Sequence, residues 1–141
     1  MICYAVIDTN VLVSALLSSH EDAATVQVLG RLLSGDVIPL FSDDILKEYN
    51  EVLLRKKFHF SEEQVCLLIQ TIEKYGEFVN PTLSGEVLTD MKDLPLYEVV
   101  LERQEDHDYL VTGNMKHFPE KPFIVTANEF LAILDNILSS K

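Results

Sequence analysis

One carboxylate stands inside the apolar run near the start of the chain. Asp8 is followed by Thr9 and Asn10 in residues 5–16, AVIDTNVLVSAL, a stretch that is otherwise almost wholly apolar. Burying an ionised carboxylate is unfavourable unless a partner or a metal ion compensates its charge. Asp8 is therefore the first candidate for chemistry, and the next question is which other residues would share its surroundings.

A second segment places a polar residue at the same point of the predicted sheet. Residues 1–7, MICYAVI, and 108–112, DYLVT, have the apolar, β-branched and aromatic character of buried strands. Asp8 follows the first of these strands, and Asn114 follows the second. Because the carboxyl ends of parallel strands share one edge of a sheet, where ligands bind, both side chains are expected in one crevice.

Two further acids approach this crevice from predicted helices. At roughly 100° per residue, Glu48 falls just outside the apolar arc of the helix in residues 42–57, closer than the neighbouring acids of that helix. Asp93 precedes the pattern LPLYEVVLE in residues 94–102 and falls at the centre of its apolar arc. Both acids are therefore expected to face the sheet edge that carries Asp8.

Each of these residues also has an ordinary structural explanation. Asp8 or Asn10 could cap the helix that follows, Glu48 alone could be a solvent-exposed charge, and Asp93 alone could be an N-cap. The sequence further predicts loop or strand-start positions for Asp90 and Asp108, and surface positions without metal-ligand spacing for His20, His59, His107 and His117. Convergence of four chain segments on one edge favours the functional interpretation.

A cluster of carboxylates at one edge predicts a bound cation. Like charges that lie within a few ångströms of one another either take up protons or bind a cation. Oxygen ligands without cysteine or histidine select hard ions such as Mg²⁺ or Mn²⁺. The expected site is thus a divalent metal ion at the end of a buried strand.

Strand patterns alternate with helix patterns along almost the whole chain. Ser42, Ser61 and Thr126 stand at N-cap positions, and Gly35 stands at a helix end. Further strands are expected in residues 36–41, 77–80 and 122–125, and helices in residues 23–35, 42–57, 61–76, 94–102 and 126–138. This alternation predicts an α/β fold, a three-layer α/β/α sandwich around a mainly parallel sheet of about five strands.

Composition and charge restrict the class of protein. The chain is 48% hydrophobic and has no internal boundary, so residues 1–141 are expected to form one domain. It has no membrane-spanning apolar stretch and no basic segment ahead of one, so we expect a cytoplasmic protein with Cys3 and Cys66 as reduced core thiols. The net charge of −12 argues against a protein that holds nucleic acid by bulk electrostatics.

Five segments, in their order along the chain, resemble the PIN domain family. They are residues 6–16, VIDTNVLVSAL; 42–53, SDDILKEYNEVL; 90–102, DMKDLPLYEVVLE; 108–119, DYLVTGNMKHFP; and 122–131, PFIVTANEFL. More narrowly, they are similar to bacterial members described as the toxin components of toxin–antitoxin systems. The resemblance implies a metal-dependent endoribonuclease that uses Mg²⁺ or Mn²⁺, leaves 5′-phosphate and 3′-hydroxyl ends, and has a central parallel sheet flanked by helices.

The resemblance also assigns roles to residues of this chain. The family's first, second and third acids fall on Asp8, Glu48 and Asp93, which would hold the metal ion. Many relatives carry a fourth catalytic acid where this chain has Asn114, and the missing charge weakens the case for a second tightly held ion. Asn10 and Thr112 match small polar positions beside the site, where they would orient Asp8 or a bound water.

An RNA strand would need positive charge near such an acidic site. The candidates to guide it are Lys47, Arg55, Lys56, Lys57 and Lys116. Residues 55–57 could equally be solvent-exposed charges at a helix end, where cations suit the helix dipole. RNA, a basic antitoxin protein and a second copy of the chain are the partners that the resemblance implies.

Other classes of protein that place an aspartate after a first strand fit less well. A phosphoaspartyl hydrolase would need an aspartate at the position of Asn10, a receiver module would need adjacent acids at the first strand, and a dinucleotide-binding domain would need a GxGxxG motif. The alternative that stays open is a catalytically degenerate PIN-like module that binds RNA or protein without cutting. Asn114 and the strong negative charge favour it.

Overall fold

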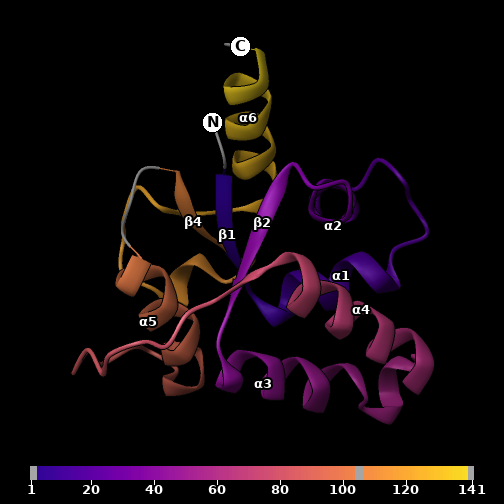
Figure 1. The fold of residues 1–141 in the computed structure, drawn as a ribbon, viewed down its shortest axis with the longest axis horizontal. Coiled ribbons are helices and arrows are strands. Elements are labelled where there is room, and N and C mark those ends of the chain that lie inside the picture. Colours follow the sequence, from indigo (N-terminus) through magenta and orange to yellow (C-terminus); the bar gives the residue numbers. More distant parts are fainter. Residues whose placement is uncertain (1–2, 104–106, 140–141) are drawn as a thin grey trace.

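A single parallel sheet forms the centre of the protein, whose computed structural model describes residues 3–103 and 107–139. In these residues five strands lie in the order β3-β2-β1-β4-β5. Figure 1 shows β2, β1 and β4 side by side. They are β1 (Cys3–Ile7), β2 (Val37–Phe41), β3 (Glu77–Phe78), β4 (Asp108–Val111) and β5 (Ile124–Val125). The predicted mainly parallel sheet of about five strands is confirmed, while residues 1–2 of the first predicted strand lie outside the described residues.

Helices form most of the connections between the strands. They are α1 (Thr9–Leu17), α2 (Ala24–Leu33), α3 (Asp43–Leu53), α4 (Glu62–Tyr75), α5 (Leu94–Arg103) and α6 (Ala127–Ser139), with short 3-10 helices η1 (Lys56–Phe58), η2 (Met91–Asp93) and η3 (Met115–His117). Right-handed crossovers put the helices between β1 and β3 on one face of the sheet. α5 returns the chain to the far side of β1 and lies opposite them in Figure 1. The predicted α/β/α sandwich is confirmed.

Side-chain caps begin helices at the predicted residues. Ser42 Oγ accepts a hydrogen bond from the N–H of Ile45 at 3.2 Å, at the start of α3. Thr126 and Glu129 each accept a hydrogen bond from the other's backbone N–H, which forms a reciprocal capping box before α6. Gly35 follows α2 with φ of +89°, a left-handed conformation that glycine adopts without strain.

One helix and one cysteine differ from the prediction. The helix expected over residues 42–57 ends at Leu53, because the charged residues 55–57 offer no apolar face that would hold another turn against the core. Cys66 is exposed, since α4 turns Val65 and Leu68 inward and Cys66 outward, so the predicted core thiol is wrong there. Cys3 is buried, and burial raises its pKa to about 12.

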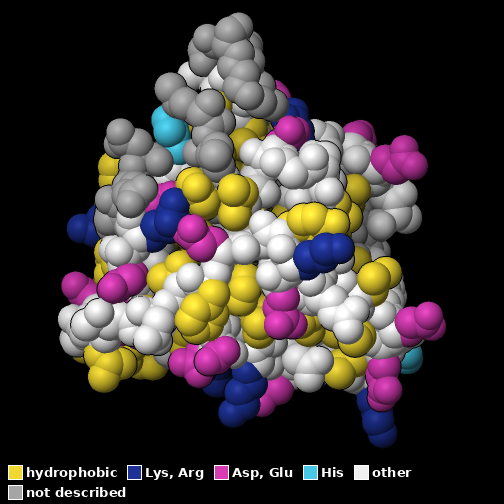
Figure 2. All heavy atoms as spheres, viewed as in Figure 1, with side chains coloured by type: hydrophobic (Ala, Val, Ile, Leu, Met, Phe, Trp, Pro, Cys, Tyr) yellow, Lys and Arg dark blue, Asp and Glu magenta, His cyan; other side chains and the backbone are white. Residues whose placement is uncertain are grey.

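The surface carries acidic groups over a wide area. Asp and Glu side chains are scattered across the face seen in Figure 2 and do not gather into one patch. In the described part of the chain no helix is long and apolar enough to cross a membrane.

The sheet order reverses beside β1. The chain runs outward from β1 to β2 and β3 and then crosses to β4 and β5 on the other side. In parallel α/β sheets such a reversal opens a crevice at the carboxyl ends of the two central strands. Here those strands are β1 and β4, which are followed by Asp8 and by the loop that begins at Thr112.

Candidate active site

Asp8 lies at the reversal point, between β1 and α1. Its backbone N–H donates to the carbonyl oxygen of Val111 at 2.9 Å, which continues the β1–β4 pairing beyond the strand. Its carboxylate Oδ1 accepts a long hydrogen bond of 3.4 Å from the N–H of Asn10 and caps α1. Asp8 is therefore both the N-cap of α1 and the acid that the sequence predicts in the crevice.

Thr112 fixes the other oxygen of this carboxylate. Its hydroxyl donates to Asp8 Oδ2 at 2.7 Å and accepts from the N–H of Asn114 at 3.0 Å. Thr112 is fully buried and Asp8 is 3% exposed. The end of β4 therefore sets the orientation of Asp8 and the course of the loop that carries Asn114.

α3 carries Glu48 to the same place. The buried Tyr49 donates its hydroxyl to the carbonyl oxygen of Ile7 at 2.5 Å, which ties α3 to the end of β1. On the adjacent residue, Glu48 Oε2 accepts from the hydroxyl of Thr9 at 2.5 Å. Glu48 is half-buried, as its place beside the apolar arc of the helix predicts.

Asp93 enters from η2 together with two residues beside it. Asp90 caps η2 by accepting from the N–H of Lys92 at 3.0 Å, and His117 Nδ1 lies 3.1 Å from Asp93 Oδ2. Potential ligand atoms of Asp90, Asp93 and His117 all lie within 4.8 Å of one another. Asp8 and Glu48 are not part of this compact group, so Asp93 is the residue that the group shares with the predicted triad.

These segments surround one hollow of about 220 Å³, which we call the acidic hollow. Its lining residues are Asp8, Thr9, Asn10, Glu48, Val52, Arg55, Asp90, Lys92, Asp93, Asn114 and His117. The structure therefore brings together the four residues that the sequence predicts at the sheet edge, Asp8, Glu48, Asp93 and Asn114. Thr112 lies buried behind Asp8.

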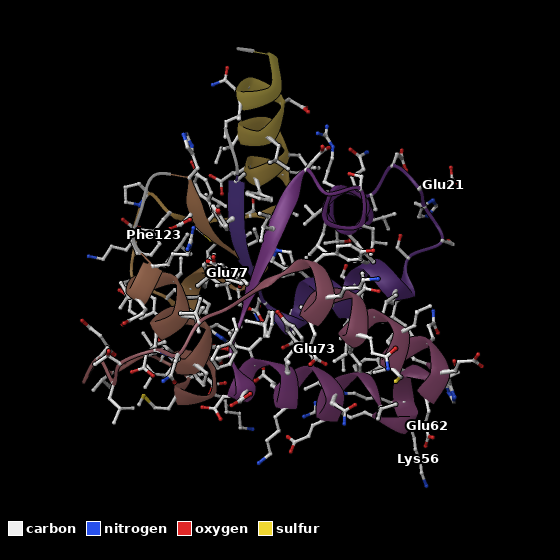
Figure 3. The ribbon with its side chains drawn as sticks, in the orientation of Figure 1. Glu21, Lys56, Glu62, Glu73, Glu77 and Phe123 are labelled. Atoms are coloured by element: carbon white, nitrogen blue, oxygen red, sulfur yellow. The ribbon has the colours of Figure 1, made fainter. Side chains whose placement is uncertain are left out.

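Few of the predicted RNA-guiding cations belong to the acidic hollow. Arg55 lines it, whereas Lys47, Lys56, Lys57 and Lys116 do not. Lys56 extends away from the ribbon at the lower right of Figure 3.

A model of a known protein family covers this arrangement. The model described as PIN domain matches residues 4–116. The chain belongs to the PIN domain family. Comparison with curated proteins and with solved structures gave no match. The matched segment of this PIN domain contains β1 except its first residue, β2 to β4, and every residue of the acidic hollow except His117.

Membership of the PIN domain family indicates the general chemistry of the acidic hollow. PIN domains are generally nucleases that use divalent metal ions, and the acidic hollow of this PIN domain offers the carboxylates for such an ion. The match over residues 4–116 confirms the PIN domain family that the sequence resembles.

In the acidic hollow of this PIN domain, the surroundings of three carboxylates raise their pKa values. Burial is the largest cause that raises the pKa of Asp8, Glu48 and Asp93. Repulsion from Asp8 further raises the pKa of Glu48 and of Asp93. The hydroxyl groups of Thr112 and Thr9 oppose these effects at Asp8 and Glu48. Carboxylates held in this way gain from a nearby cation.

Five residues that line the acidic hollow were not assigned to the site from the sequence: Thr9, Val52, Asp90, Lys92 and His117. Asp90 lies in a loop, as the sequence predicts, but it also lines the hollow. His117 contacts Asp93, although the sequence predicts a surface position without a role in the site. Two signals were present. Asp90 precedes Asp93 by three residues, a spacing at which 3-10 side chains eclipse, and His117 lies in the loop that carries Asn114.

Proposed function

We propose that this PIN domain is a metal-dependent endoribonuclease that hydrolyses phosphodiester bonds of RNA with Mg²⁺ or Mn²⁺. The observation that carries the proposal is the meeting of Asp8, Glu48 and Asp93, from three distant segments, around one hollow where the sheet order reverses. Family membership supports the nuclease chemistry. RNA as the substrate is the part that the proposal adds.

The donor atoms of the acidic hollow fit a hard divalent ion. Asp8, Glu48 and Asp93 supply carboxylate oxygens, and Asp90 and His117 lie close enough to Asp93 to contribute. Burial and mutual repulsion raise the pKa of Glu48 and Asp93, a strain that a cation would relieve. An ion held here would supply positive charge to the phosphoryl group and lower the pKa of water.

The protein's own groups hold and surround these ligands. Thr112 and Thr9 donate to the carboxylates of Asp8 and Glu48 and so fix their direction. Arg55 and Lys92 line the hollow and can neutralise the phosphates of a bound strand. Asn114 lines the hollow with an uncharged amide that can hydrogen-bond to water or to the substrate.

Cleavage of a labelled single-stranded RNA in Mg²⁺ or Mn²⁺ tests the proposal. EDTA is expected to stop cleavage, and Asp8→Asn, Glu48→Gln and Asp93→Asn are each expected to lower kcat roughly 100-fold or more, the scale of a lost transition-state contact. Glu51→Gln changes an exposed acid one turn along α3 and should leave kcat unchanged. Cleavage that survives in Asp8→Asn would overturn the proposal.

Asn114 favours a second candidate function. Because it stands where many relatives carry a fourth acid, this chain could bind RNA or protein without cutting. Failure of every form to cleave RNA, combined with binding that EDTA does not weaken, would support this module in place of the nuclease.

We further propose that the protein is the toxin of a toxin–antitoxin pair. The resemblance to bacterial toxins supports this role, and the net charge of −12 suits a basic antitoxin segment. Expression in a bacterial host is expected to arrest growth, whereas the Asp93→Asn variant is not. Arrest that does not depend on Asp93 would contradict the role.

We also propose that the chain forms a homodimer. Its molar mass in solution, measured by light scattering, tests this proposal.

A further inference from the structure

A second hollow adjoins the acidic one beside α1, α3 and η1. It has a volume of about 530 Å³, and we call it the flanking hollow. Asn10, Val52 and Arg55 line both hollows. A polymer held at the acidic hollow would therefore enter the flanking hollow without leaving the protein surface.

The flanking hollow combines apolar and cationic side chains. Val13, Leu17 and Phe58 give it an apolar wall, and Leu17 is 55% exposed. Arg55 and Lys57 add positive charge, and Lys57 Nζ lies 5.1 Å from the centroid of the Phe58 ring. The residues that line this hollow include no acid, and within the described chain neither cation forms a salt bridge.

A nucleotide matches both properties of this lining. Its base has an apolar face that packs on aromatic and aliphatic side chains, and its phosphate pairs with arginine or lysine. In a chain with a net charge of −12, the two cations and the absence of a carboxylate in its lining make this hollow favourable for an anion.

We propose that the flanking hollow binds the nucleotide next to the cleaved bond of a single-stranded RNA. The base lies against Leu17 and Phe58, and the phosphate lies beside Arg55 and Lys57. The strand is unpaired at this position, because a base inside a duplex does not expose its face to a side chain. This inference rests on the proposed ribonuclease function and adds a substrate subsite to it.

Two pairs of residues provide matched variants. Leu17 and Leu33 are the last residues of α1 and α2 and are 55% and 56% exposed, but only Leu17 lines the flanking hollow. An aspartate should disturb the dipole of either helix end equally, so Leu33→Asp controls for Leu17→Asp.

The lysine pair is matched in the same way. Lys57 lies over Phe58, and Lys74 lies over Tyr75 with its Nζ 5.3 Å from the ring centroid. Lys74 does not line the flanking hollow, so Lys74→Ala controls for Lys57→Ala.

The test measures affinity for a short fluorescent single-stranded RNA in Ca²⁺, with electrophoresis to verify that the RNA stays intact. Leu17→Asp and Lys57→Ala are expected to weaken binding about fivefold or more, as the loss of one base or phosphate contact does. Lys57→Ala should also reduce the slope of log K against log salt by about 0.7, the value for one single-strand phosphate. Both control variants should bind like the wild type.

Failure of this inference can be told apart from failure of the proposed function. If Leu17→Asp and Lys57→Ala bind the RNA as tightly as their controls, the flanking hollow is not a nucleotide subsite, whether or not the wild type cuts. If these variants lose affinity while no form cuts RNA, the flanking hollow is a nucleotide-binding site of a protein that binds RNA without cutting it, and the ribonuclease function is wrong. Unchanged RNA affinity with loss of a dimer in Leu17→Asp would assign the hollow to a second copy of the chain.

Discussion

The hydroxyl of Thr112 serves two neighbours at once. It donates to Asp8 and accepts from the N–H of Asn114, in a position with no solvent exposure. A buried polar atom that loses its partner costs about 1–3 kcal/mol, because no water replaces the missing bond. This hydroxyl therefore links the orientation of Asp8 to the backbone path of the loop that carries Asn114.

Thr112→Val keeps the shape of the side chain and removes this hydroxyl. We expect the free energy of unfolding in urea to fall by about 1–3 kcal/mol. RNA cleavage should fall roughly 10–100-fold, the usual effect of losing a group that orients a metal ligand. Thr71→Val is the control, since the hydroxyl of Thr71 bonds to a carbonyl on an exposed stretch of α4. If Thr112→Ser, which retains the hydroxyl, loses as much activity, the hydrogen bond is not the cause.

Glu48 is expected to destabilise the metal-free protein. Its pKa is raised, so between its unfolded and folded pKa values the folded chain binds more protons and loses stability as pH rises. At neutral pH, Glu48→Gln removes this charge and should raise the Tm measured in EDTA above that of the wild type. Mn²⁺ should raise the Tm of the wild type more than that of Glu48→Gln. A lower Tm for Glu48→Gln than for Glu51→Gln in EDTA would contradict this expectation.

Periodicity explains which site residues could be predicted from the sequence. Asp8 follows a strand and Glu48 lies on a strongly amphipathic helix, so the direction of each side chain follows from regular structure. Asp90 caps the short 3-10 helix η2 and His117 ends η3, and at such positions side-chain direction depends on local contacts such as the one between His117 and Asp93. Their places could not be read from spacing alone.

At the scale of elements, a buried hydrogen bond helps to hold α3 against the sheet. Tyr49 donates to the carbonyl oxygen of Ile7, the last residue of β1, and it is 2% exposed. Because Glu48 is the neighbouring residue, the same bond sets the distance between Glu48 and the start of α1.

Tyr49→Phe removes that bond and leaves the ring in place. The free energy of unfolding should fall by about 1 kcal/mol, the usual net value of such a bond. We expect kcat for RNA to fall several-fold with little change in KM, because α3 would no longer hold Glu48 in register with β1. Tyr75→Phe, at a tyrosine that is 63% exposed, should change neither quantity. Equal loss of stability in both variants would contradict this role of Tyr49.

The lengths of elements were less predictable than their order. β3 and β5 have two residues each, shorter than the apolar patterns in residues 77–80 and 122–125. Both lie at the edges of the sheet and pair with one neighbour, so pairing ends where that neighbour's strand ends. The pattern records apolar character, whereas strand length is decided by a partner elsewhere in the chain.

At the scale of the whole molecule, the excess of acids should make stability depend on salt. With a net charge of −12, the folded chain repels itself, and salt screens that repulsion over a Debye length of about 10 Å at 0.1 M. Raising NaCl from about 0.01 M to about 0.15 M should raise the Tm of the metal-free protein by a few degrees. Choline chloride should act equally, since screening does not depend on the cation. A Tm that falls with either salt would contradict the explanation.

The sheet order is the part of the architecture that the sequence left open. Alternating helices and strands predict parallel pairing and right-handed crossovers, but either side of β1 is open to a later strand under those rules. The prediction that Asp8 and Asn114 lie at the same edge of the sheet did not depend on the strand order, because the carboxyl ends of all parallel strands lie at that edge. That β4 pairs directly with β1, with Ile7 opposite Val111, depends on packing of the complete chain.

The direct pairing of β1 with β4 has a consequence for the timing of protein synthesis. Asp8 is translated before Thr112 and His117, which follow it by more than 100 positions. A nascent chain that stops before β4 has neither the strand that completes the pocket nor the hydroxyl that orients Asp8. If the protein cuts RNA as proposed, it remains inert toward the message from which it is being translated until β4 and Thr112 have emerged from the ribosome.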